Sequence, residues 1–166
     1  MGKSLSGKVA VYPGTFDPVT YGHIDIIRRA SKIFSKVIVG VSIHSSKEPL
    51  FSVGERVNML KQATKGLQGV RVCSFSGLAV RFAHQNKARV IIRGLRMLSD
   101  FEYEFQMALT NRTLAQDIET IFMMPHESYS YMSSRLLKEA VGLGADISKF
   151  VPSFVQEALR QKVKRV

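Results

Sequence analysis

Residues 9–23 read VAVYPGTFDPVTYGH, and this stretch decides the fold of the chain. Its apolar start predicts a buried strand, its middle a loop rich in Gly and Pro. An amphipathic run follows and predicts a helix, with apolar positions at Ile24, Ile27, Ala30, Ile33 and Phe34. Phosphate binds at such strand–loop–helix units, because the free N–H groups and the dipole of a helix start attract anions. Thr20 and His23 add side chains that can donate to a phosphoryl oxygen there.

Apolar stretches of strand character alternate with helical patterns along the whole chain. We expect strands over 8–13, 37–43, 69–75, 89–93 and 118–124, and helices over 22–34, 54–65, 78–86, 99–115, 131–141 and 152–163. This alternation predicts an α/β fold: one Rossmann-like, doubly wound domain over residues 1–166, with a five-stranded parallel sheet and helices on both faces. Ligands of such sheets bind beyond the strand C-termini, where the strand order reverses.

Length and composition exclude several classes of protein. The chain has 166 residues, enough for one hydrophobic core. Its apolar runs, such as 37–41, are far shorter than the roughly 20 residues that span a bilayer. We see no secretory signal, and the single cysteine, Cys73, excludes an internal disulfide and is typical of a core position. We therefore expect a cytoplasmic protein with no membrane partner.

The formal net charge of +11 indicates anionic partners, either nucleic acid, an anionic membrane surface or phosphorylated small molecules. The sequence has no zinc-finger, RRM or KH pattern, so nucleic acid is not the partner we expect. It also has no P-loop, no Gly-x-Gly-x-x-Gly and no Gly-x-Ser-x-Gly motif. The four histidines, at positions 23, 44, 84 and 126, show no metal-ligand spacing.

The loops after the second and fourth predicted strands carry cations. Lys47 lies in a Ser-rich loop, where it can meet a phosphate or simply be a solvated surface lysine. Arg93 and Arg96 flank a glycine directly after a buried strand, and guanidinium groups suit bidentate phosphate recognition. Because a charge beside a buried strand needs a partner, the alternative is an ion pair of these arginines with Glu102 or Glu104.

The loop after the fifth strand is rich in serine, at positions 128, 130, 133 and 134. Serines before an apolar helical run indicate an N-cap. One serine suffices for a cap, so the cluster indicates a second anion-binding helix start, whose hydroxyl and N–H groups can hold a triphosphate.

Five segments together resemble the bacterial phosphopantetheine adenylyltransferases. They are VYPGTFDPVTYGH (11–23), IRGLR (92–96), DFEYE (100–104), MSS (132–134) and LKE (137–139). The match runs in order and spacing from about residue 8 to the C-terminus. Thr20-x-Gly22-His23 alone would indicate only the broader nucleotidyltransferase superfamily, and the arginine loop with the acidic-aromatic run makes the resemblance specific.

The resemblance implies transfer of an adenylyl group from ATP to 4′-phosphopantetheine, giving dephospho-coenzyme A and pyrophosphate in coenzyme A biosynthesis. It implies that His23 stabilises the transition state. By matching position, the ATP-binding residues are Thr15, Phe16, His23, Gly94, Leu95, Arg96, Glu104, Tyr129, Ser130, Tyr131, Met132, Ser133, Ser134 and Arg135. The phosphopantetheine-binding residues are Thr15, Lys47, Ala79 and Arg93. The family is hexameric, uses magnesium and is inhibited by coenzyme A.

Two positions depart from the family pattern. Arg135 stands where some members carry a small hydroxyl residue, so its triphosphate contacts are expected to differ. Ala79 is smaller than its counterpart in some members, which leaves its contact with the pantetheine arm to the backbone.

The implied mechanism is consistent with the residues present. A phosphate monoester has a second pKa of about 6, so it is a nucleophile at neutral pH without a general base. The protein then has to position the substrates and stabilise charge. No carboxylate cluster reads as a magnesium site, so we expect Mg²⁺ to arrive on the ATP phosphates. Two alternatives remain: adenylyl or cytidylyl transfer to another small phosphate such as nicotinamide mononucleotide, and a basic nucleic-acid-binding module.

Overall fold

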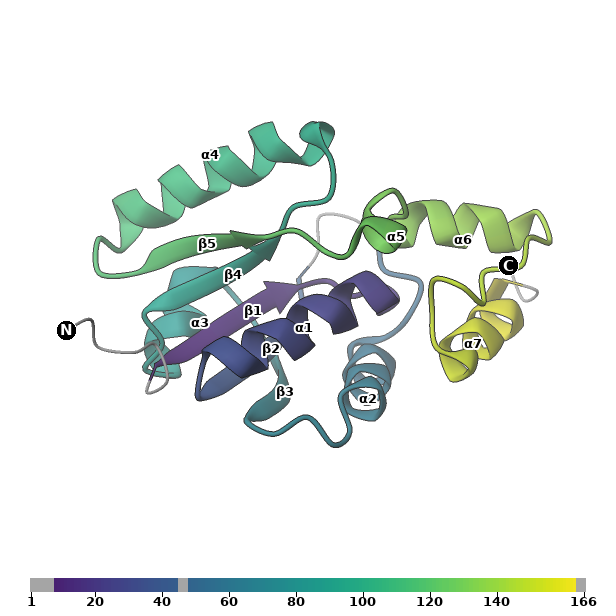
Figure 1. The fold of residues 1–166 in the computed structure, drawn as a ribbon, viewed down its shortest axis with the longest axis horizontal. Helices are drawn as coiled ribbons and strands as arrows, with labels where there is room; N and C mark the ends of the chain where they lie inside the picture. The colour runs from purple at the N-terminus through teal and green to yellow at the C-terminus, as the bar shows by residue number, and fades with distance from the viewer. Residues whose placement is uncertain (1–7, 45–47, 164–166) are drawn as a thin grey trace.

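Strands and helices alternate through the residues described by the computed structural model, 8–44 and 48–163 (Figure 1). The strands are β1 (Val9–Gly14), β2 (Lys36–Ser42), β3 (Val70–Phe75), β4 (Val90–Gly94) and β5 (Glu119–Met123). The helices are α1 (Tyr21–Ile33), α2 (Val53–Ala63), α3 (Ala79–Gln85), α4 (Leu98–Leu114), α5 (Glu127–Ser130), α6 (Ser134–Gly142) and α7 (Ser153–Val163). The predicted strands and the first four predicted helices are confirmed, and each of their ends lies within two residues of the predicted position.

The five strands form one sheet in the order β3-β2-β1-β4-β5, and every neighbouring pair is parallel. The order therefore reverses between β1 and β4. Strand β1 pairs with β2 along its whole length, Val9 to Gly14, but with β4 only at Ala10 and Val11. Because their pairing stops early, β1 and β4 separate toward their C-terminal ends, which leaves room for a ligand at the predicted edge.

Apolar side chains cover both faces of the sheet, as the predicted doubly wound fold requires. Along β1, Ala10 and Tyr12 point to one core with α1, α2, α6 and α7, whereas Val11 points to the other with α3. Figure 1 shows α6 and α7 beyond the C-terminal ends of the strands, and α4 running along β5. No helix in the described ranges is long and apolar enough to cross a membrane.

The segment after β5 differs from the sequence prediction of one helix over 131–141. A short helix, α5, comes first, and its start is capped by His126, whose side chain accepts from the N–H of Ser128. The chain then breaks, and α6 begins at Ser134 because the hydroxyl of Ser133 accepts from the N–H of Leu136 over 3.0 Å. The cap that the serine cluster predicts is thus Ser133, three residues later than expected.

Candidate active site

A cavity of about 340 Å³ lies where β1 and β4 separate, walled by the starts of α1 and α6. Twelve of the sequence-predicted site residues line it, from four segments far apart in the chain. They are Thr15, Phe16, His23, Arg93, Gly94, Arg96, Glu104, Tyr129, Met132, Ser133, Ser134 and Arg135. The sheet edge thus brings together the loops that the sequence singled out.

Other predicted residues lie elsewhere. Leu95 does not line the cavity, and its N–H donates to the carbonyl of Met123. Ser130 and Tyr131 lie at the end of α5, away from the lining, and Ala79 is the first residue of α3. Lys47 lies outside the described residues. The ligand roles of these five residues stay predictions.

Thr20 and His23 hold each other at the start of α1. The hydroxyl of Thr20 accepts from the N–H of His23 over 3.4 Å, and the N–H of Thr20 donates to Nδ1 of His23 over 3.1 Å. This is a capping box in which histidine takes the place that Glu or Gln usually fills. Thr20 is therefore a helix cap that orients His23, and a contact of its side chain with phosphate stays a prediction.

This arrangement settles the protonation of the His23 ring. Burial lowers its pKa to about 3, and the positive charges of Arg96 and Arg93 act in the same direction. The ring is thus neutral near pH 7, and Nδ1 is the acceptor because it receives the N–H of Thr20. The hydrogen-bond network therefore assigns the proton to Nε2, which is left to donate to a ligand.

The backbone at the start of α1 is less free than the sequence analysis assumed. The N–H of Tyr21 donates to the carbonyl of Phe150 over 2.8 Å, and the N–H of His23 is taken by Thr20. The expectation that a row of unpaired N–H groups binds phosphate here was therefore wrong for these two. The side chain of His23 is the more available donor.

Phe16 supports His23 from the other side. Its backbone φ is +51°, a left-handed conformation that costs an L-residue roughly 1–2 kcal/mol. The buried ring packs edge-on against Tyr12 and His23, with ring centroids 5.3 Å and 5.0 Å away. Strain of this kind persists only where the surroundings fix it, and it gathers at functional sites.

Arg93 bridges the gap between β4 and β1. Its Nε and Nη2 donate to the two carboxylate oxygens of Glu104 over 2.7 and 2.6 Å, and its Nη1 donates to the carbonyl of Pro13 over 2.8 Å. The ion pair that the sequence left as an alternative is therefore present. Arg93 still lines the cavity, with a quarter of its side chain exposed (26%).

Arg96 and Gly94 occupy the same loop. Arg96 pairs with Asp100 over 3.0 Å, in the first turn of α4, rather than with Glu102 or Glu104. A Cβ at Gly94 would lie 3.0 Å from Cδ1 of Ile26, so a larger residue would fit only if the Ile26 side chain shifted slightly. Both residues nevertheless line the cavity.

The serines after β5 have local partners. The hydroxyl of Ser130 donates to the carbonyl of Glu127, and that of Ser134 donates to the carbonyl of Pro18 over 2.8 Å. Ser133 caps α6. Its hydroxyl hydrogen remains for a ligand, as do the first N–H groups of α6, which have no partner within the helix. The anion-binding capacity here thus comes from the helix start more than from the serine count.

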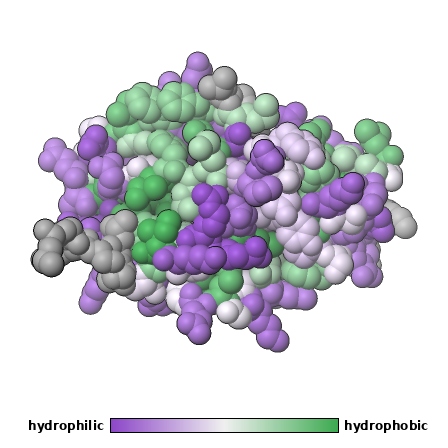
Figure 2. Space-filling view, in the orientation of Figure 1, coloured by the Kyte–Doolittle hydropathy of each residue, from purple (hydrophilic) through white to green (hydrophobic). Residues whose placement is uncertain are grey.

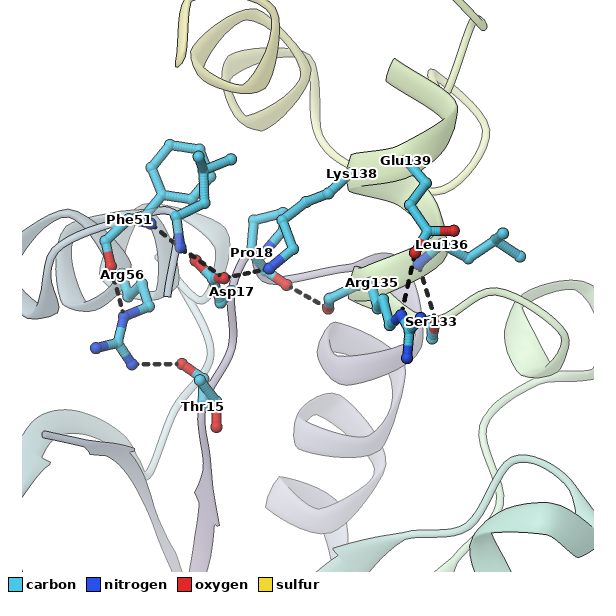
Figure 3. A network of polar contacts seen from close by, with 12 residues as sticks. Thr15, Asp17, Pro18, Phe51, Arg56, Ser133, Arg135, Leu136, Lys138 and Glu139 are labelled. Carbon is cyan, nitrogen blue, oxygen red and sulfur yellow. Dashed lines mark hydrogen bonds and ion pairs between the residues drawn. The ribbon is translucent and has the colours of Figure 1, made fainter. Parts of the chain in front are cut away.

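Three residues around the cavity were missed by sequence reasoning: Asp17, Arg56 and Lys138. The Asp17 carboxylate accepts from the N–H groups of Leu50 and Phe51, each over 2.9 Å, and from Nζ of Lys138 (Figure 3). The signal for Asp17 was a charged residue in the loop directly after β1. Lys138 lies in the LKE segment that carries the family resemblance but was given no role, and Arg56 sits in an ordinary helical pattern, where nothing local marks it.

Within 8–44 and 48–163, no group of three or more His, Cys, Asp or Glu side chains is placed to hold a metal ion. Among the described residues the cavity lining carries four cationic side chains, Arg93, Arg96, Arg135 and Lys138, and three carboxylates, Asp17, Glu48 and Glu104, so cations outnumber carboxylates by only one.

The amino-acid sequence of this chain is similar to those of known proteins. A family described as cytidylyltransferase-like matches residues 11–140. A phosphopantetheine adenylyltransferase of Caldanaerobacter subterraneus is 52% identical over 158 residues, which are 95% of this chain and 99% of the relative. Another, of Nitrosomonas eutropha, is 53% identical over 152 residues, 92% of this chain and 93% of the relative.

Similarity of fold extends further than similarity of sequence. A crystal structure described as that of a nicotinate-nucleotide adenylyltransferase from Vibrio parahaemolyticus superimposes with a TM-score of 0.66 at 20% identity. The match covers 92% of this chain and 98% of the other. At this identity it bears on the α/β fold alone, which it confirms.

Proposed function

This chain belongs to the phosphopantetheine adenylyltransferase family, among the cytidylyltransferase-like proteins, and from that membership we infer its reaction. It transfers an adenylyl group from ATP to 4′-phosphopantetheine, and the products are dephospho-coenzyme A and pyrophosphate. The observation that carries the assignment to this cavity is the meeting of the residue 14–23 loop, the Arg93–Arg96 loop and the start of α6 around one space.

His23 is the group we assign to the transition state. It presents a neutral imidazole whose free nitrogen, Nε2, carries a proton, while Nδ1 is fixed by Thr20. A neutral donor aimed at the α-phosphate stabilises charge as it develops on the phosphoryl oxygens. It does not compete with the phosphopantetheine phosphate as a base. The nucleophile is already dianionic near neutral pH, so no proton has to be removed.

The cationic groups divide between the two substrates. We assign Arg93, Lys47 and the backbone at Ala79 to phosphopantetheine, as matching positions imply. Glu104, which the resemblance implies contacts ATP, also holds the Arg93 guanidinium in place, since both its carboxylate oxygens accept from it. Arg96, with Gly94 and Leu95, is assigned to ATP.

The triphosphate is assigned to the start of α6. The helix dipole, the free N–H groups and the hydroxyl of Ser133 favour an anion there. Arg135 is exposed and pairs with Glu139 over 3.0 Å, so it can swing toward the β- or γ-phosphate at little cost. Met132 and Tyr129 line the same wall of the cavity. Ser130 and Tyr131, at the end of α5, are assigned to ATP as well, as their matching positions imply.

Magnesium is proposed to arrive with ATP. Mg²⁺ prefers phosphate and water oxygens and keeps several waters when bound. Bound there, Mg²⁺ would supply positive charge to the pyrophosphate leaving group, while the residues of this chain bind the phosphate oxygens that remain.

A homohexamer is proposed as the assembly, as the family resemblance implies. The observation in its support is a stripe of exposed apolar residues along one face of α4, at Phe101, Phe105 and Leu109. Figure 2 shows hydrophobic residues gathered along the edge where α4 runs. A stripe of this kind is typical of a protein–protein interface. We also propose that coenzyme A inhibits the protein, as the family resemblance implies, and that the protein is cytoplasmic.

The reaction is tested by mixing the protein with ATP, Mg²⁺ and 4′-phosphopantetheine and measuring pyrophosphate and dephospho-coenzyme A. We expect both products in equal amounts. A parallel reaction with nicotinamide mononucleotide tests the alternative acceptor. Pyrophosphate released only with nicotinamide mononucleotide would overturn the assignment, and salt-dependent nucleic-acid binding without turnover would favour the binding module.

A further inference from the structure

Arg56 is a buried cation beside the active site with an unusual set of partners. It lies in the first turns of α2, behind a capping box of Ser52 and Glu55, and is only 1% exposed. In the described part of the chain no carboxylate lies within ion-pair distance of its guanidinium. Buried arginines usually have such a partner.

The guanidinium instead binds three backbone carbonyls from three different segments. Its Nη1 donates to the carbonyl of Thr15 over 2.8 Å and to that of Ser42 over 3.0 Å, while its Nε donates to the carbonyl of Phe51 over 3.0 Å. Arg56 thereby joins the loop after β1, the end of β2 and the segment before α2. Figure 3 shows it bridging Thr15 and Phe51.

Asp17 holds the same junction from the other side. It binds the N–H of Phe51, whose carbonyl is bound by Arg56, so one residue is gripped at both of its backbone polar groups (Figure 3). Thr15 and Asp17 flank Phe16 in the chain. The two charged side chains therefore fix the backbone on both sides of Phe16.

Phe16 needs that restraint because its φ of +51° is unfavourable. Its ring contacts the imidazole of His23 at a centroid distance of 5.0 Å. Release of the Thr15 carbonyl would let Phe16 relax toward negative φ, and the ring would move away from His23. When a mutation far from the reacting atoms displaces a catalytic group by about 1 Å, the rate can fall on the order of 100-fold.

We propose that Arg56 is a positioning residue for adenylyl transfer, which acts by holding the Thr15 carbonyl and, through Phe16, the imidazole of His23. This inference rests on the proposed function. Arg56 does not line the cavity, so it acts without touching either substrate. A guanidinium suits the task because its planar fork serves several acceptors in fixed directions, which neither Lys nor an apolar side chain can do.

Two substitutions test the proposal. Arg56→Lys keeps the charge but cannot reach three carbonyls, and Arg56→Met keeps similar volume without charge. We expect kcat to fall about 10- to 100-fold in both, with KM for ATP and for phosphopantetheine changed by no more than about threefold. Circular dichroism at the assay temperature establishes that the variants are folded. Arg71→Lys and Arg71→Met, at an exposed arginine of β3, serve as matched controls and should keep wild-type kcat.

A double-mutant cycle with His23→Ala, measured in single turnovers, separates positioning from general support of the fold. If Arg56 acts through His23, Arg56→Lys should slow the His23→Ala enzyme by less than about threefold. The imidazole that Arg56 would position is already absent from that enzyme. The ring nitrogen NMR signals of His23 in the ligand-free protein should also shift in Arg56→Lys and not in Arg71→Lys.

Each result is decisive. Wild-type protein that releases no pyrophosphate would refute the proposed function, whatever the variants do. Active wild type with unchanged kcat in both Arg56 variants would overturn the positioning role. An equal loss in the wild-type and His23→Ala backgrounds, or loss of folded structure in both Arg56 variants, would overturn it as well, because Arg56 would then act elsewhere or only on stability.

Discussion

The backbone N–H of Thr20 donates to Nδ1 of His23 over 3.1 Å, while the N–H of His23 returns to the hydroxyl of Thr20. One local motif therefore starts a helix and also fixes which nitrogen of the histidine bears the proton. The imidazole that we propose to stabilise the transition state is therefore oriented by the first turn of the helix that carries it.

His23→Ala should lower kcat by about 100- to 1000-fold, as removal of one donor to a developing oxyanion typically does. KM for ATP should change little, because the contact strengthens in the transition state. Steady-state kinetics with each substrate varied measures both. His84→Ala, at an exposed histidine paired with Asp117, is the control. A loss carried by KM with kcat intact would assign His23 to ground-state binding.

The stability of the protein should depend on pH through His23. The folded-state pKa is lowered to about 3 by burial, Arg96 and Arg93, whereas in the unfolded chain it is about 6.5. Between these values the unfolded state binds the extra proton, so stability falls as the pH drops below about 6.5. Wild type should lose more Tm than His23→Gln between about pH 7.5 and about pH 5. Equal losses would show that the ring is not held neutral.

Breaking the ion pair of Arg93 with Glu104 should reduce both stability and binding. Glu104→Gln should lower the free energy of unfolding by about 3 kcal/mol, the lower end for a buried pair, since Arg93 is partly exposed. It should also raise KM for phosphopantetheine more than KM for ATP. Denaturant titration and kinetics of Arg93→Lys, Glu104→Gln and the double variant test this. Additive effects of the two substitutions would deny the coupling.

Asp17→Asn should loosen the segment after β2. The amide offers one oxygen where the carboxylate binds the N–H groups of Leu50 and Phe51, and it leaves Lys138 without its partner. We expect a loss of about 1.5–3 kcal/mol in unfolding free energy, as for other hydrogen bonds to a charged group. Asp117→Asn, at an exposed aspartate, should show no change. Equal stability of the two variants would mean that the Asp17 bonds contribute nothing net.

Phe105→Glu should dissociate the proposed assembly. The charge would lie in the middle of the α4 stripe, between Phe101 and Leu109, and would be buried without a partner in an interface. Light scattering coupled to size exclusion measures the mass of wild type and variant. Thr110→Glu adds the same charge on another side of α4 and should leave the mass unchanged. A monomeric wild type would refute the hexamer itself.

Much of the fold was readable in the sequence because its signals are local. Alternating apolar runs gave the strands, the Ser52–Glu55 spacing marks the start of α2, and the carboxyl ends of parallel strands must share one edge. Once the loops after β1 and β4 were recognised as suited to anions, their meeting at one cavity required only the parallel topology. The switch point of the sheet then placed the site.

Partners distant in the chain were not readable. Asp17 and Lys138 are 121 positions apart, and Arg93 and Pro13 are 80 apart, so no spacing rule relates them. The sequence left open whether Arg93 would face a ligand or Glu104, because either anion can accept the hydrogen bonds of its guanidinium. The structure has the carboxylate there.

The sequence by itself therefore determined the strands, most of the helices, the parallel arrangement of the sheet and the edge at which the cavity lies, because periodicity and strand-end loops are local properties. Only the tertiary structure decided how charge is distributed around that edge. In the folded chain His23 accepts a hydrogen bond from Thr20, Arg93 donates to Glu104, and Arg56 donates to three backbone carbonyls. Polar groups removed from water must find whichever partners the packed chain brings near, and that depends on all the segments at once.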